Sequence, residues 1–101
     1  MTARYRLRIA IDAQEDLERL FAFLVEHDLD AALRARAAIE RAYALLQDFP
    51  FACRKVDQTN PFLRELLVPF GSAGYVVLFE IGADATVTVA AVRHQREDDY
   101  R

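Results

Sequence analysis

Apolar and polar side chains alternate strictly at the start of the chain, over Arg4–Ile11. The apolar positions are Tyr5, Leu7, Ile9 and Ile11, and the positions between them include Arg4, Arg6 and Arg8. A period of two is typical of a strand with one buried face. The three arginines therefore share the other face, which is either a solvated surface that discourages edge pairing or a docking strip for an acidic partner.

Apolar residues recur with a helical period in the next two segments. The stripe of the first segment consists of Ala13, Leu17, Leu20, Phe21 and Leu24, and its charged residues, Asp16 among them, take the other side. This helix is expected from Asp12 to about residue 27, with Asp12 and Glu15 at capping-box spacing. Either aspartate of residues 27–30 is suited to cap a second helix, which runs to about Asp48. The short connection predicts an antiparallel hairpin.

Three short apolar segments follow, Leu63–Phe70, Tyr75–Ile81 and Val87–Val92. Their connections are short, so they are expected to form an antiparallel meander. We expect residues 49–61 to form an irregular loop. The predicted fold class is α+β, in the order β-α-α-β-β-β, with the helical hairpin packed on one face of a mostly antiparallel four-stranded sheet and the other face open. Residues 1–101 are expected to form one domain.

Composition narrows the class of protein. The net charge of −3 argues against a protein that binds nucleic acid mainly by covering phosphates. Cys53 is the only cysteine, which excludes an internal disulfide and fits a reducing cytoplasm. The amino terminus lacks the apolar run of a signal peptide or membrane anchor. No glycine-rich phosphate loop or Cys/His metal spacing is present, so we expect no cofactor and no metal.

Basic and aromatic residues outside the helices are the candidates for chemistry. The last strand is expected to bring Arg93, His94, Arg96 and Tyr100 to one edge of the sheet, with Arg54, Lys55 and Arg64 as further cations. A metal-free ribonuclease needs an acid or base, for which His94 is suited, and cations to stabilise the charged intermediate. Tyr100 would stack on a base. The alternative is a solvated terminus with local ion pairs, and for Arg64 a contact with Glu65 or another structural contact.

Several short strings, in this order and spacing, resemble the RelE/ParE superfamily of bacterial type II toxins. They are Tyr5-Arg6-Leu7, Ala13 followed by Asp16-Leu17, Phe49-Pro50, Leu63-Arg64-Glu65-Leu66, Gly74-Tyr75-Val76-Val77-Leu78-Phe79 and Val92-Arg93-His94-Gln95-Arg96-Glu97-Asp98. Together they span nearly the whole chain. The resemblance implies a growth-inhibiting toxin that is neutralised by a cognate antitoxin, part of which folds on binding. Candidate contacts for the antitoxin or the target are Arg4, Arg6, Arg8, Arg64, Arg93, Arg96 and Tyr100.

The resemblance leaves the target open between two branches. ParE-like toxins poison DNA gyrase and are not known to use a catalytic constellation of their own. RelE-like toxins cut messenger RNA on the ribosome, and in that branch the catalytic places would fall to Lys55, Arg64, Arg93 or His94, and Tyr100. The acidic net charge, the single lysine and the long helical hairpin favour the ParE-like branch. A non-toxic member that only binds its antitoxin is a third reading, and an exposed sheet edge leaves a homodimer of the free protein open.

Overall fold

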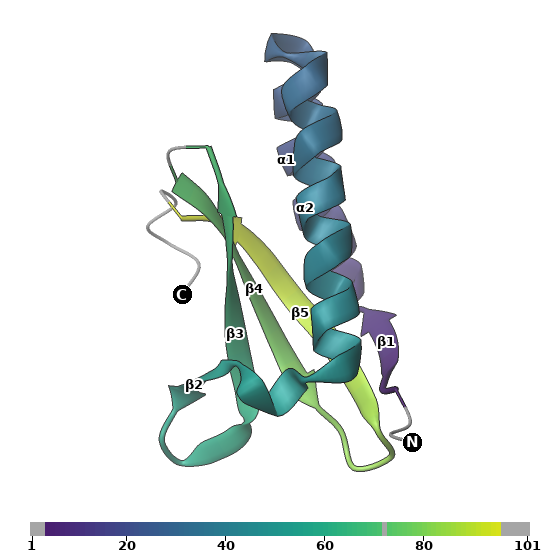
Figure 1. Cartoon of the computed structure of the whole chain (residues 1–101), viewed down its shortest axis with the longest axis vertical. Helices are drawn as coiled ribbons and strands as arrows, with labels where there is room; N and C mark the ends of the chain where they lie inside the picture. The colour runs from purple at the N-terminus through teal and green to yellow at the C-terminus, as the bar shows by residue number, and fades with distance from the viewer. Residues whose placement is uncertain (1–3, 72, 96–101) are drawn as a thin grey trace.

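The computed structural model describes residues 4–71 and 73–95, and within them two helices lie side by side on one face of a five-stranded sheet (Figure 1). The elements in chain order are β1 (Arg6–Ile9), α1 (Ile11–His27), α2 (Leu29–Asp48), a 3₁₀ turn (Pro50–Ala52), β2 (Arg54–Asp57), β3 (Asn60–Phe70), β4 (Ala73–Ile81) and β5 (Thr86–His94). The helical hairpin extends past the end of the sheet (Figure 1). The α+β class and the position of the hairpin are confirmed.

The strand order is β1-β5-β4-β3-β2, with β1 parallel to β5 and the other pairs antiparallel. The predicted meander is therefore confirmed, but the predicted number of strands is wrong. The extra strand, β2, lies in the segment expected to be an irregular loop, where Arg54 faces Glu65 and Lys55 faces Arg64. All four residues of β2 are exposed. The strand therefore has no buried face, and its sequence lacks the alternation of apolar and polar residues that would predict a strand.

The last strand of the meander, β5, lies between β1 and β4, an order that the sequence pattern leaves open. Burial explains the order. Val87, Val89 and Val92 of β5 are completely buried, whereas Arg6 and Arg8 of β1 are exposed. An apolar strand gains most from two neighbours and a helical cover, while short polar strands are suited to the edges.

The core lies between the helices and the inner face of the sheet. Its members include Ala35, Ala38, Ile39 and Leu46 from α2 and Val77, Phe79, Val87, Val89 and Val92 from the sheet. Phe79 is the largest fully buried side chain. The small side chains of the buried alanines of α2 let its backbone approach the sheet closely.

The N-cap of α2 agrees with the sequence prediction, and the N-cap of α1 does not. Asp28 caps α2, because its carboxylate accepts a hydrogen bond from the Ala31 amide at 3.2 Å. The predicted Asp12 cap of α1 is wrong, since the N-cap is Ala10, two residues earlier, and the helix begins at Ile11. The Ala10 amide still donates to the Val89 carbonyl at 2.9 Å, so the chain passes directly from the sheet into the helix. Asp12 instead lies in the first turn, where the helix dipole favours its charge.

Two glutamines cover part of the outer edge of β1. The side-chain amide of Gln47 donates to the Tyr5 carbonyl at 3.2 Å, and that of Gln14 donates to the Ile9 carbonyl at 3.0 Å. The Tyr5 amide donates to the Gln47 carbonyl at 2.9 Å. These bonds occupy backbone groups that would otherwise be open to another strand.

Neither helix in the described parts of the chain is long and apolar enough to cross a bilayer.

Candidate functional site

Arg6 and Arg8 of β1 lie on the open face of the sheet, whereas Arg4 precedes β1 and contacts α2. Arg4 pairs with Asp48 at the end of α2, at 2.9 Å, and Arg6 pairs with Asp84 in the β4–β5 turn, at 3.2 Å. Arg8 makes no hydrogen bond or ion pair with any residue in 4–71 or 73–95. Arg6 and Arg8 thus share a face as predicted, and Arg4 does not, because its guanidinium contacts α2. Among the three, Arg8 alone has no such partner within the described residues.

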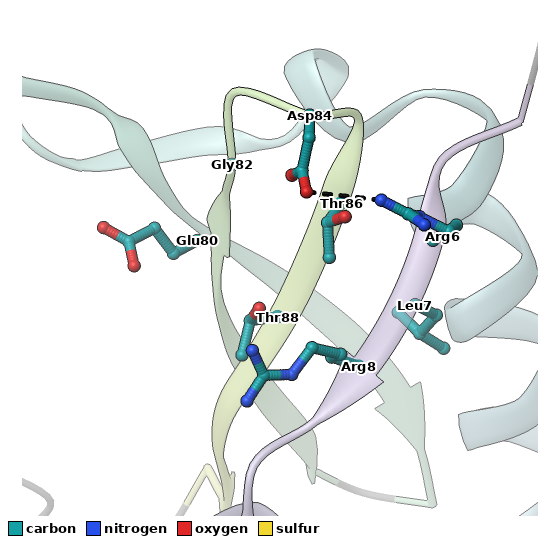
Figure 2. Close-up of a pocket in the computed structure, with 8 residues that line it drawn as sticks. All are labelled: Arg6, Leu7, Arg8, Glu80, Gly82, Asp84, Thr86 and Thr88. Atoms are coloured by element: carbon teal, nitrogen blue, oxygen red, sulfur yellow. Dashed lines mark hydrogen bonds and ion pairs between the residues drawn. The ribbon is translucent and has the colours of Figure 1, made fainter.

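An open hollow of about 530 Å³ lies beside Arg6 and Arg8 (Figure 2). Its lining residues are Arg6, Leu7, Arg8, Glu80, Gly82, Asp84, Thr86 and Thr88. The strand register explains why they meet: Arg8 of β1 lies opposite Thr88 of β5, and Thr88 lies opposite Glu80 of β4. Arg6 lies opposite Thr86 in the same way, and the Arg6–Asp84 ion pair spans the end of the hollow near the turn.

Arg64 has a structural role in the described chain. Its guanidinium donates to three backbone carbonyls, those of Pro61 at 2.7 Å, Cys53 at 2.8 Å and Phe51 at 3.1 Å. It also lies over the Phe51 ring, 5.3 Å from the ring centre. Arg64 therefore ties the 3₁₀ turn and the start of β2 to β3.

Three residues near Arg64 were further candidates for a site or a contact: Cys53, Lys55 and Glu65. Burial raises the pKa of the Cys53 thiol, and the positive charge of Arg64 opposes that rise. A buried thiol with a raised pKa is poorly suited to nucleophilic attack. Lys55 lies opposite Arg64 on the edge strand β2 and is exposed. Glu65, which the sequence offered as an Arg64 partner, instead accepts from Arg54 at 2.6 Å.

Arg93 forms an ion pair with Asp16 of α1. The same Asp16 carboxylate accepts a hydrogen bond from the Val92 amide at 2.9 Å. It does so just beyond the stretch of β5 that β1 covers, so a helix side chain takes over from the neighbouring strand. Only 12% of the Asp16 side chain is exposed. The assignment of Asp16 to the solvent side of its helix is therefore wrong, because the sheet edge comes close to that side.

His94 lies at the end of β5 among aromatic side chains. Its ring meets the Tyr75 ring edge to face, with 5.6 Å between the centres, and Tyr75 stacks on Phe70 at 5.7 Å. Burial raises the pKa of the Tyr75 phenol. The Arg34 guanidinium of α2 lies 5.9 Å from the centre of the Phe70 ring. His94 thus belongs to a cluster at the far end of the sheet from β2.

Within the described residues, the structure separates two of the candidate nuclease residues, Lys55 and Arg64, from Arg93 and His94. Arg64 lies opposite Phe79 and His94 lies opposite Tyr75, on the two strands that flank β4. With about 3.4 Å per residue and about 4.8 Å per strand spacing, their Cα atoms are roughly 17 Å apart. Arg96 and Tyr100 lie outside the described residues.

The sequence patterns did not single out Thr86, Thr88 or Glu80 as residues of a site. Thr86 and Thr88 alternate with Val87 and Val89, so a period of two was present that would have placed both hydroxyls on the open face. Nothing in the sequence brings Glu80 near Arg8, because that depends on strand order. No group of three or more His, Cys, Asp or Glu side chains suited to hold a metal occurs in residues 4–71 and 73–95.

Comparison with known proteins identifies the family. The family model described as "ParE toxin of type II toxin-antitoxin system, parDE" matches residues 7–99. This chain belongs to that toxin family. Toxin RelE1 of Caulobacter vibrioides is 33% identical to this toxin over 85 residues, which cover 83% of this chain and 88% of the relative. Toxin RelE3 of the same organism is 37% identical over 86 residues, covering 84% and 88%.

Solved structures agree with the fold of this toxin. A chain of the chromosomal ParDE system from P. aeruginosa superposes with a TM-score of 0.68 at 15% identity, covering 89% of this toxin and 95% of that chain. A chain of the RelBE2 toxin–antitoxin complex from Mycobacterium tuberculosis superposes with a TM-score of 0.61 at 20% identity, covering 90% and 98%. The protein is thus a type II toxin of the RelE/ParE superfamily, as its sequence motifs predict.

Proposed function

We propose that this toxin inhibits growth by a ParE-like action on DNA gyrase in the cytoplasm, and that a cognate antitoxin neutralises it. The dispersal of the candidate nuclease residues carries the proposal. General acid–base catalysis needs its groups within hydrogen-bond reach of one reacting centre. Arg64 is bonded to backbone carbonyls, Arg93 is paired with Asp16, and His94 is roughly 17 Å from Arg64. An inhibitor that acts by binding needs no such cluster.

The antitoxin is proposed on two grounds. The solved relatives come from systems named ParDE and RelBE, in which the toxin is accompanied by an antitoxin. The open face of the sheet also leaves an exposed strand with a cation that has no hydrogen bond or ion pair in the described chain, Arg8. Such a face is suited to a segment that folds on binding.

Induction of the toxin in a tightly controlled bacterial host tests the target. Thymidine and amino-acid incorporation are followed over the first minutes, with purified gyrase assayed in parallel for supercoiling and for trapped DNA breaks. We expect thymidine incorporation to fall first and supercoiling to stop. An early arrest of amino-acid incorporation with gyrase unaffected would contradict the gyrase proposal. If neither process falls, the protein is a non-toxic antitoxin binder.

A RelE-like endoribonuclease is the second candidate, because both curated relatives carry the name RelE. Under this reading His94 and Tyr100 take part in messenger RNA cleavage on the ribosome. The variants His94→Ala and Tyr100→Ala would then lose toxicity and keep antitoxin binding. Tyr43→Phe, a change on α2 away from these residues, is the matched control. Full toxicity of both alanine variants would eliminate the nuclease reading.

A further inference from the structure

The hollow on the open face contains four charged side chains in two different situations. Arg6 and Asp84 form an ion pair, with 3.2 Å between a guanidinium nitrogen and a carboxylate oxygen, although both side chains are 72% exposed. Arg8 and Glu80 have no hydrogen-bond or ion-pair partner in residues 4–71 and 73–95. They sit two strands apart in one row, with Thr88 between them, so their Cα atoms are separated by about 10 Å. The hollow therefore has one cation and one anion ready for a ligand, at opposite sides.

Arg8 and Thr88 are close enough to donate hydrogen bonds to the same carboxylate. The Arg8 side chain reaches across β5 beside Thr88, while Glu80 extends outward from β4 (Figure 2). A guanidinium donates two parallel hydrogen bonds to a carboxylate, and a threonine hydroxyl can donate a third. The Thr88 hydroxyl makes no hydrogen bond within the described chain, so it is available. Sheet strands hold the backbone of both residues, so only their side chains become ordered on binding.

Two acidic residues of the lining, Glu80 and Asp84, make the hollow less suited to nucleic acid than to a protein segment. Glu80 lies at the side of the hollow and Asp84 at its end, so a chain of phosphates that reached Arg8 would meet a carboxylate nearby. A protein segment carries isolated carboxylates and can place a basic or amide side chain against Glu80. The charges therefore favour an acidic side chain of a protein over nucleic acid.

We propose that Arg8 and Thr88 form a seat for a single carboxylate side chain of the antitoxin, with Glu80 excluding polyanions. The inference rests on the proposed pairing of this toxin with an antitoxin. Of the three arginines Arg4, Arg6 and Arg8, only Arg8 is proposed to recognise the antitoxin, because Arg4 and Arg6 are already paired within the chain.

Binding of the full toxin chain to its antitoxin tests the seat. The toxin is made by cell-free synthesis, and the probe is the protein encoded beside the toxin gene, immobilised at 150 mM salt. Arg8→Gln should weaken binding at least about 10-fold, because a charge-assisted pair is lost. Thr88→Val removes the hydroxyl at similar volume and should weaken it about 3-fold or more. Arg36→Gln, which removes the same charge from an exposed position of α2, is the matched control and should change binding less than about 2-fold.

Folding of the variants is easy to verify, because Arg8 has no partner to lose within the described chain and its removal should leave the melting temperature unchanged. Antitoxin binding that survives Arg8→Gln at full strength would overturn the seat and leave the proposed function standing. Absence of binding by the unmodified toxin would overturn the seat together with the proposed antitoxin pairing, and would leave the gyrase proposal to its own test. Binding of a labelled single-stranded RNA tests the alternative that the hollow binds nucleic acid. RNA binding that falls in Arg8→Gln and rises in Glu80→Gln, with antitoxin binding unchanged, would reassign the hollow to nucleic acid.

Discussion

Removal of the Arg64 guanidinium should destabilise the toxin much more than removal of an exposed arginine does. Three backbone carbonyls, those of Phe51, Cys53 and Pro61, would lose their donor at once. Arg64→Met is the most informative change, because it keeps an unbranched side chain and removes every donor. The loss would fall on the contact between the 3₁₀ turn, β2 and β3.

The magnitude follows from the three hydrogen bonds and the ring contact. A hydrogen bond from a charged donor contributes about 1.5–3 kcal/mol when well buried. Arg64 is only half-buried, so we take about 0.5–1 kcal/mol for each of its three bonds. The contact with the Phe51 ring adds about 0.5 kcal/mol. The unfolding free energy should fall by about 2–3 kcal/mol, which lowers the melting temperature by roughly 10 °C or more in a domain of this size.

Urea unfolding followed by circular dichroism at 222 nm measures this change, with thermal melting as a second readout. Arg36→Met is the matched control, since Arg36 pairs with Glu40 on an exposed helix surface and should cost less than about 0.5 kcal/mol. Arg64→Lys should recover only part of the loss, because an ammonium cannot reproduce the planar arrangement of the guanidinium donors.

An Arg64→Met unfolding free energy within about 0.5 kcal/mol of the unmodified toxin would refute the structural role of Arg64, because a change that small is typical of surface substitutions. The guanidinium would then be available for a target, and the argument against a nuclease site would lose one of its supports. If the destabilisation is observed, loss of toxicity in an Arg64 variant is explained by unfolding and says nothing about catalysis.

Three further changes test other parts of the fold. Asp16→Ala should lower the unfolding free energy by about 2 kcal/mol and accelerate hydrogen exchange at the Val92 amide, because a half-buried ion pair and an edge hydrogen bond are lost. Tyr43→Phe should leave stability unchanged or raise it by up to about 1 kcal/mol, because the buried Tyr43 hydroxyl has no hydrogen-bond partner in the described chain. Burial raises the pKa of Tyr43 to about 12, so the unfolded chain deprotonates first and the unmodified toxin should lose more stability than Tyr43→Phe between about pH 10 and 12, measured by melting. Gly74→Ala should lower the melting temperature by about 10 °C or more, because Gly74 has a φ of 153° and an added Cβ would collide with the Val68 carbonyl.

Much of the fold could be predicted from local pattern. The alternation at Tyr5, Leu7 and Ile9 identified a strand, the helical stripes identified the hairpin, and the short turns forced the meander. The strand β2 could not be found this way, since Arg54–Asp57 buries nothing and pairs only because β3 extends beyond the core. The Asp12 cap was misplaced because the sheet determines where α1 begins.

The candidate site was predicted in its residue types and only partly in its arrangement. The sequence placed Arg4, Arg6 and Arg8 on one face, which is confirmed for Arg6 and Arg8 but not for Arg4, whose guanidinium contacts α2. It could not tell that two of them are neutralised by Asp48 and Asp84, which lie 44 and 78 residues away along the chain. Nor could it show that Arg64 donates to backbone carbonyls, since no residue pattern marks such a contact.

The sequence by itself determined the inward stripes of the two helices and the antiparallel pairing of β3, β4 and β5, because periodicity and turn length are local properties. The tertiary structure alone decided the parallel pairing of β1 with β5, the row that joins Arg8, Thr88 and Glu80, and the hydrogen bond that the Val92 amide donates to Asp16. These contacts join residues 72 to 80 positions apart along the chain, apart from the neighbouring pair of β4 and β5. They form when the whole core packs, so no local pattern encodes them.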